Sequence, residues 1–226
     1  MAVTDPEAAS VDLEERGRIV SLASKVPPTV VAVVLGLAIS VFVVMGILQR
    51  TAFPEWNVAN LDSEGSVATG FAAALLWGAA FWWLLVAVVT RPVSAANWLW
   101  WPVLAWLAID EGTAIHERLE RWSGIDWQLL YVPVMVFSGA VWWGVVRTHR
   151  RQARIVALLF FAAAAWGVAL VLELVQNWGG PPVQAAIYVP TMITEEALEM
   201  IGSTALLIAG ILALRESVGA TPKIPE

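Results

Sequence analysis

The fold is decided by the stretch Ala108-Ile109-Asp110-Glu111-Gly112-Thr113-Ala114-Ile115-His116-Glu117-Arg118, which places three acids and a histidine on a mostly apolar segment. The uncharged run that precedes Asp110 starts near Ala96 and is too short to cross a bilayer alone, because a crossing needs about 20 apolar residues. We therefore predict one helix from residue 96 to residue 118, which carries Asp110 and Glu111 into the far half of the membrane. Ionisable residues at that depth are costly and usually functional.

The whole chain has the composition of an integral membrane protein. Of its 226 residues, 59% are hydrophobic and 14% are charged, and the mean hydropathy is +0.71. Soluble domains average roughly 45–50% apolar and about 25% charged residues. The net charge of −6 argues against a nucleic-acid partner, which needs a basic surface. The chain has no cysteine and only two histidines, so we expect no iron–sulfur cluster and no bis-histidine haem.

The apolar runs predict an all-α bundle of six transmembrane helices within residues 27–215. The expected spans are about 29–49, 67–89, 96–118, 127–146, 155–178 and 189–214. Residues 1–26 form an N-terminal tail in this prediction, and residues 216–226 form a C-terminal tail. Pro190 suits the first turn of the last span, because a helix does not need the N–H that proline lacks there.

The basic residues predict a multi-pass protein of the cell membrane with both termini in the cytoplasm. In this orientation only Arg50, Arg118 and Arg121, of 13 basic residues, lie outside. His149 falls in the basic loop 147–154, and we expect it to be solvated or to face lipid headgroups. Most of the 14 tryptophans, Trp100 among them, are expected at the membrane interfaces, where indoles gather.

Two later stretches, 172–177 and 194–199, add acids at a similar depth. The third and fifth spans run outward with their acids near the C-terminal end, whereas the sixth runs inward with its acids near the N-terminal end. With a rise of about 1.5 Å per residue, Asp110 lies about 21 Å and Glu199 about 22 Å from the inner ends of their helices, and Glu173 lies about 27 Å out. We therefore expect the three groups to meet in the outer half of the bilayer.

These acids and one imidazole predict a metal site. So many carboxylates cannot all be ionised and unpaired in hydrocarbon, so protonation, a bound metal ion or contact with water is required. Carboxylate and imidazole ligands suit Fe, Mn, Zn or Ca ions. Carboxylate-bridged dimetal bundles use the same ligand types, but the chain lacks their paired Glu-x-x-His motifs. The candidate ligands are Asp110, Glu111, His116, Glu117, Glu173, Glu195 and Glu199.

Two motifs carry a resemblance. The pattern Asp-Glu…His-Glu at residues 110–117 and the pattern Glu-Glu-x-x-Glu at residues 195–199, on six spans, resemble those of an uncharacterised group of prokaryotic multi-pass membrane proteins. The likeness covers the third and sixth spans. It favours the six-span fold and implies no particular activity.

Three functions fit this pattern, and the sequence does not choose between enzyme and non-enzyme. The leading hypothesis is a carboxylate-rich metal site in the outer half of the bilayer, belonging to a metal-dependent enzyme that acts on a lipid-phase substrate. The second is a cation- or proton-coupled transporter that uses the same acids. The third is a non-catalytic subunit of a larger membrane complex. The lipid bilayer is the expected partner in each case, and a homo-oligomer is compatible with all three.

Overall fold

The computed structural model describes Ser21 and residues 25–56, 60–61, 66–90, 93–178 and 180–219, with the backbone alone for 177–186 and 218–219. Most of the two predicted tails lies outside these residues. The described part is all-α, as predicted. Its helices are α2 (Pro28–Thr51), α3 (Val67–Val89), α4 (Ala95–Thr113), α5 (Ile115–Ser123), α6 (Trp127–Leu130), α7 (Val132–Thr148), α8 (Ala153–Trp178) and α9 (Gly180–Gly219).

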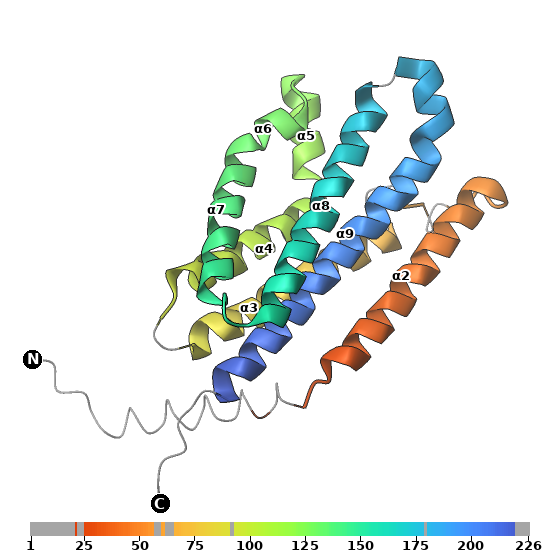
Figure 1. The fold of residues 1–226 in the computed structure, drawn as a ribbon. Helices are drawn as coiled ribbons and strands as arrows, with labels where there is room; N and C mark the ends of the chain where they lie inside the picture. The colour runs from red at the N-terminus through yellow and green to blue at the C-terminus, as the bar shows by residue number, and fades with distance from the viewer. Residues whose placement is uncertain are drawn as a thin grey trace, which may run out of the picture.

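The long helices run alternately in opposite directions, so that the start of α2 and the end of α9 lie at the same end of the bundle (Figure 1). Among the described residues, four segments are long and apolar enough to cross a membrane: α2, α3, Ala153–Gln176 of α8 and Ile187–Ser217 of α9. Helix α7 is apolar but shorter. The chain is therefore a multi-pass membrane protein.

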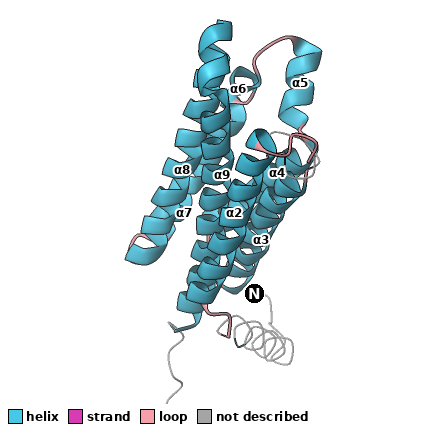
Figure 2. Cartoon of the chain, turned by 90° about the vertical axis from the view of Figure 1, so that its right-hand side faces the viewer, coloured by secondary structure: helices cyan, strands magenta, loops and turns pink. Residues whose placement is uncertain are grey.

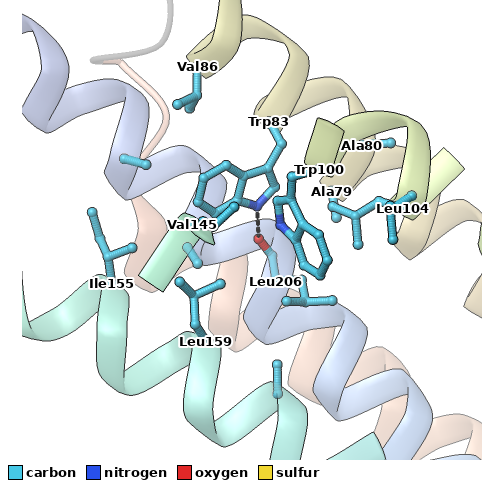
Figure 3. Packing of buried hydrophobic residues seen from close by; sticks show 14 of the residues in the cluster. Ala79, Ala80, Trp83, Val86, Trp100, Leu104, Val145, Ile155, Leu159 and Leu206 are labelled. Atoms are coloured by element: carbon cyan, nitrogen blue, oxygen red, sulfur yellow. Dashed lines mark hydrogen bonds between the residues drawn. The ribbon is translucent and has the colours of Figure 1, made fainter. Parts of the chain in front are cut away.

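Helix α9 is the centre of the bundle, because α2, α3 and α8 all pack against it. It approaches α3 closely at Gly210, where an added Cβ would lie 2.9 Å from the Cβ of Trp82 and 3.2 Å from the Trp83 ring. The Trp83 side chain is completely buried, and its indole N–H donates to the carbonyl oxygen of Leu206 at 3.1 Å (Figure 3). Glycine at 210 thus allows a large aromatic side chain to fill the space between the two helices.

The prediction of one helix over residues 96–118 is wrong. Helix α4 ends at Thr113, Ala114 takes the left-handed conformation with φ 50° and ψ 51°, and α5 begins at Ile115. Figure 2 shows α5 beyond the end of α4, beside α6. The cause lies in Asp110, whose carboxylate accepts the backbone N–H of His116 at 3.0 Å and so caps the first turn of a new helix.

The last helix also differs from its prediction. Helix α9 begins at Gly180, and Pro190 lies inside it. The chain can start the helix early because Pro181 and Pro182 occupy the first turn, where a missing N–H costs nothing. Pro190 then removes one backbone hydrogen bond from the helix interior. The bilayer-crossing part still starts near the predicted position, at Ile187.

His149 is buried, contrary to the expected solvated position. Its side chain packs edge-on to Trp83, its Nε2 atom lies 3.3 Å from the Asn97 side-chain oxygen, and its Nδ1 atom pairs with Gln152. Burial holds the pKa of His149 below its ordinary value of 6.5, although the hydrogen bond with Gln152 and the charge of Glu216 act in the opposite direction. The imidazole is therefore neutral at neutral pH and joins the loop after α7 to α3 and α4.

We predict that Gly210→Ala lowers the midpoint of thermal unfolding in detergent, because the new methyl group overlaps Trp82 and Trp83. Overpacking of this kind costs about 1–3 kcal/mol. The matched control is Gly36→Ala, at an exposed glycine of α2 with no atom within 4 Å of the added Cβ. Equal midpoints for the two variants would contradict the close packing of α3 on α9.

We also predict that acid destabilises the protein through His149. Since the folded-state pKa lies below the unfolded one, the unfolded chain takes up a proton first as the pH falls through the ordinary value of 6.5. The stability that comes from burying His149 as a neutral imidazole is therefore complete above pH 6.5 and is lost as the pH falls below it. Between about pH 7.5 and about pH 5, the unfolding midpoint of the parent should fall further than that of His149→Gln. Parallel pH profiles would show that this imidazole is not buried in its neutral form.

Candidate functional site

A cavity of about 670 Å³ lies between α4, α5, α7, α8 and α9 toward the end of the bundle where α5 and α6 are found. This volume is within the range of about 300–1,000 Å³ that is usual for small-molecule sites. Three separate stretches of sequence meet at it, as the depth argument predicted. All seven predicted site residues line the cavity: Asp110, Glu111, His116, Glu117, Glu173, Glu195 and Glu199.

Asp110 forms hydrogen bonds through both oxygens of its carboxylate. One oxygen, Oδ1, accepts the Tyr131 hydroxyl at 2.7 Å and the backbone N–H of His116 at 3.0 Å. The other, Oδ2, lies 3.0 Å from Nδ1 of His116. Asp110 therefore joins α4 to α5 and to the start of α7, and it fixes the orientation of the His116 ring. The Nε2 atom of His116 makes no hydrogen bond with any residue that the structure describes.

Glu173 forms a second network on the other side of His116. Its Oε1 atom accepts the indole N–H of Trp127 at 2.6 Å, and its Oε2 atom accepts the side-chain amide of Gln128 at 3.3 Å. The Trp127 ring packs against the imidazole, with ring centroids 4.7 Å apart. His116 thus lies within the electrostatic field of acids from α4 and α8. A histidine in this position can accept a proton and release it again.

Glu199 differs from both, because it makes no hydrogen bond with the described part of the chain. Its side chain is mostly buried, and the charges that act on it are all acidic: Glu111, Glu196, Glu195 and Glu173. Like charges in a partly desolvated site repel one another strongly. Protons, a bound cation or water in the cavity must therefore offset the charge around Glu199.

The remaining acids have protein partners. Glu195 accepts a hydrogen bond from the side-chain amide of Gln176. Glu117 pairs with Arg121 at 2.8 Å, in an exposed pair one helical turn apart. Within the ranges that the structure describes, no three His, Asp or Glu side chains form a group that could hold a metal ion. The predicted metal site is therefore not assembled in this conformation and stays a prediction.

Sequence reasoning missed three members of the site: Trp127, Gln128 and Tyr131. Trp127 is one of the tryptophans expected at the membrane interface. The available signal is the polar start of the fourth apolar run, where Asp126, Trp127 and Gln128 follow one another and one of the chain's two tyrosines, Tyr131, comes three residues later. These side chains come from the segment that connects α5 to α7.

The apolar part of the cavity contains two indoles, Trp100 and Trp166. Trp100 was expected at the interface, but it is only 5% exposed. The indole nitrogens of both residues are buried, and neither has a hydrogen-bond partner among the described residues. Trp166 lies against Gly202 of α9, where an added Cβ would come within 2.6 Å of its ring. The cavity therefore has carboxylates at one end, and the indole nitrogens beside its apolar portion are enclosed by protein.

A protein-family model, described as a domain of unknown function (DUF8692), matches residues 29–214. The chain belongs to the DUF8692 family. The match runs from the start of α2 almost to the end of α9, so the DUF8692 region includes every predicted site residue. The chain thus belongs to a family of unknown function, which agrees with the resemblance of its two acidic motifs to an uncharacterised group. No curated protein and no solved structure matches the chain.

We predict that Asp110→Asn destabilises α5 and lowers the unfolding midpoint in detergent. The substitution weakens hydrogen bonds to a buried charge, which are each worth about 1.5–3 kcal/mol. Hydrogen exchange measured by mass spectrometry should be faster in the peptide that spans His116. The control is Glu117→Gln, which breaks an exposed i,i+4 pair worth about 0.3–0.5 kcal/mol. If both variants exchange at the same rate, Asp110 does not hold the helix break.

Proposed function

We propose that the protein is a membrane enzyme that holds a divalent metal ion in its carboxylate cluster, beside a substrate drawn from the lipid phase. The observation that supports this function is the environment of Glu199, a half-buried carboxylate with four acidic neighbours and no hydrogen-bond partner in the described chain. A divalent cation would remove the repulsion between these charges. The proposed ligands are Glu111, Glu195 and Glu199, from α4 and α9, whose carboxylates would have to move closer together to hold the ion.

Asp110 and Glu173, whose carboxylates already accept hydrogen bonds from the protein, have a different role in this proposal. Asp110 keeps the proton of His116 on Nδ1, which leaves Nε2 for the reaction. A carboxylate that orients a histidine in this way also raises its basicity. His116 is therefore the group that moves a proton to or from the substrate, and Glu173 with Trp127 holds the other side of its ring. The metal ion would act as a Lewis acid on an oxygen of the substrate.

We further propose six membrane crossings, with both termini in the cytoplasm. The four long apolar helices are joined by two composite crossings, α4 with α5 and α6 with α7. The basic residues of α7, α8 and α9 lie at the end of the bundle where α2 begins, opposite the cavity. The positive-inside rule places that end in the cytoplasm. The carboxylates then face the outside, as in the predicted orientation.

One observation favours the rival function, a proton- or cation-coupled carrier. Ser203 follows Glu199 at i+4, so the two residues lie on the same face of α9. Ser203 and its neighbour Thr204 are buried, and their hydroxyl oxygens have no partner in the part of the chain that the structure describes. These hydroxyls place polar atoms between the acids and the middle of the bundle, where a carrier would need them.

The test is elemental analysis of the detergent-purified protein after separate loading with Mn²⁺, Fe²⁺, Zn²⁺ and Ca²⁺. We expect stoichiometric retention of at least one of these ions by the parent and a loss of that metal in Glu199→Gln. The matched control is Glu216→Gln, an exposed glutamate at the opposite end of the same helix. It should bind metal as the parent does.

The absence of metal from the parent under every loading condition would contradict the enzyme proposal. Proton uptake by the parent in liposomes, abolished in Glu199→Gln, would then support the carrier. A loss of metal in both glutamine variants would show that Glu199 is not a specific ligand.

A further inference from the structure

We propose that the ligand of the cavity is a single-chain amphiphile with an uncharged, oxygen-bearing polar end, and that it enters sideways from the bilayer between α7 and α8. This inference rests on the proposed function, because it names the substrate class of the same site. It is carried by the shape of the cavity, by the Nε2 atom of His116 at its polar end and by the exposed small residues that line one wall.

The cavity is elongated along the bundle and changes character along its length. On α8 its lining runs from Gln176 to Ala162, a distance of about 21 Å at 1.5 Å per residue. Glu173 and Gln176 line the polar end, and Ala162 with Leu206 of α9 lines the apolar end. A long, narrow space that is polar at one end and apolar at the other suits a molecule with a polar head and one hydrocarbon chain.

The polar end of the cavity contains an imidazole nitrogen without a protein partner. His116 lines the cavity, its Nδ1 atom lies 3.0 Å from Asp110, and its Nε2 atom makes no hydrogen bond with any residue that the structure describes. A neutral imidazole with its proton on Nδ1 accepts a hydrogen bond at Nε2. The proposed ligand therefore carries a hydroxyl group that can donate to this nitrogen. The indole nitrogens of Trp100 and Trp166, by contrast, are enclosed by protein.

The wall between α7 and α8 opens toward the outside of the bundle. Three small residues that line the cavity, Gly139, Ala163 and Gly167, are at the same time exposed on the surface. No atom lies within 4 Å of a Cβ added at either glycine. The two helices meet at Trp142, whose indole N–H donates to the Leu159 carbonyl at 3.3 Å. The opening lies on the side of this contact that is nearer the acids, before Trp142 on α7 and after Leu159 on α8.

This opening faces hydrocarbon. The residues beside it on α7 and α8 are large, apolar and exposed: Val136 is 67% exposed, Phe137 is 53% exposed and Val168 is 49% exposed. On a membrane protein such side chains contact lipid tails. An amphiphile could therefore pass into the cavity without leaving the bilayer. An anionic head group would be repelled by the acids, and a cationic head group would compete with the proposed metal ion for them, which leaves an uncharged oxygenated head as the best match.

The experiment uses the full-length protein in lipid nanodiscs and a monoacylglycerol with a diazirine in its acyl chain. After irradiation, mass spectrometry locates and quantifies the label. We expect labelling of α7 and α8 peptides that line the cavity, and a decrease of about tenfold in the double variant Gly139→Leu, Gly167→Leu. Leucine at these positions narrows the opening without meeting other atoms, so the fold should be kept.

Two controls make the result specific. Gly36→Leu adds the same side chain at an open glycine of α2 and should not change cavity labelling. An alkane diazirine of equal chain length lacks the hydroxyl groups and should label the cavity peptides more weakly than the monoacylglycerol. Undiminished labelling in the double variant, or equal labelling by the alkane, would overturn the proposal.

Metal analysis of the same preparations separates the two proposals. The double glycine variant should keep its metal ion while losing the label, and Glu199→Gln should lose its metal ion while still being labelled in the apolar portion. Normal labelling of a parent that binds no metal would refute the metal site and leave the amphiphile site supported.

Discussion

The structure depends on the carboxylate of Asp110 at the point where α4 ends. Its two oxygens cap the first turn of α5, hold the His116 ring and receive the Tyr131 hydroxyl. Three segments of chain are therefore fixed to one another by a single side chain in an apolar setting. A charge there is tolerated because each of its oxygens is hydrogen-bonded, as buried charges require. The same bonds make Asp110 a positioning residue for His116, although the sequence marked it as a metal ligand.

The break at Ala114 has a consequence for the acids on the other helices. Because the helix ends there, α5 and α6 bring His116 and Trp127 to the cavity where the acids lie, and Gln128 to Glu173. Asp110 and Glu173 are satisfied by protein donors, whereas the charges that act on Glu199 are those of other acids. Glu199 is therefore where a cation is to be sought, while Asp110 and Glu173 hold the residues around the imidazole.

The sequence alone predicts the bounds of the long apolar helices and the end of the bundle at which the acids meet. Hydropathy found α2, α3 and α8 to within a few residues, because continuous apolar runs of this length have few other structures available. The break at residue 114 could not be predicted, because alanine is the best helix former and a left-handed alanine carries no local signal. That break comes from a side chain four residues earlier. The burial of His149 likewise depends on Asn97 and Trp83, which are distant in sequence.

Acids from α4 and α9 lie together at one end of the bundle. Because the chain has no cysteine, introduced cysteines can be crosslinked without competing thiols. The most direct measurement is the yield of crosslinked protein in native membranes, with a short thiol crosslinker, for the pair Glu111→Cys and Glu199→Cys. We predict efficient crosslinking of this pair and none for Glu111→Cys with Glu216→Cys, at opposite ends of the bundle. Equal yields, or crosslinking of the second pair alone, would contradict this arrangement of the acids.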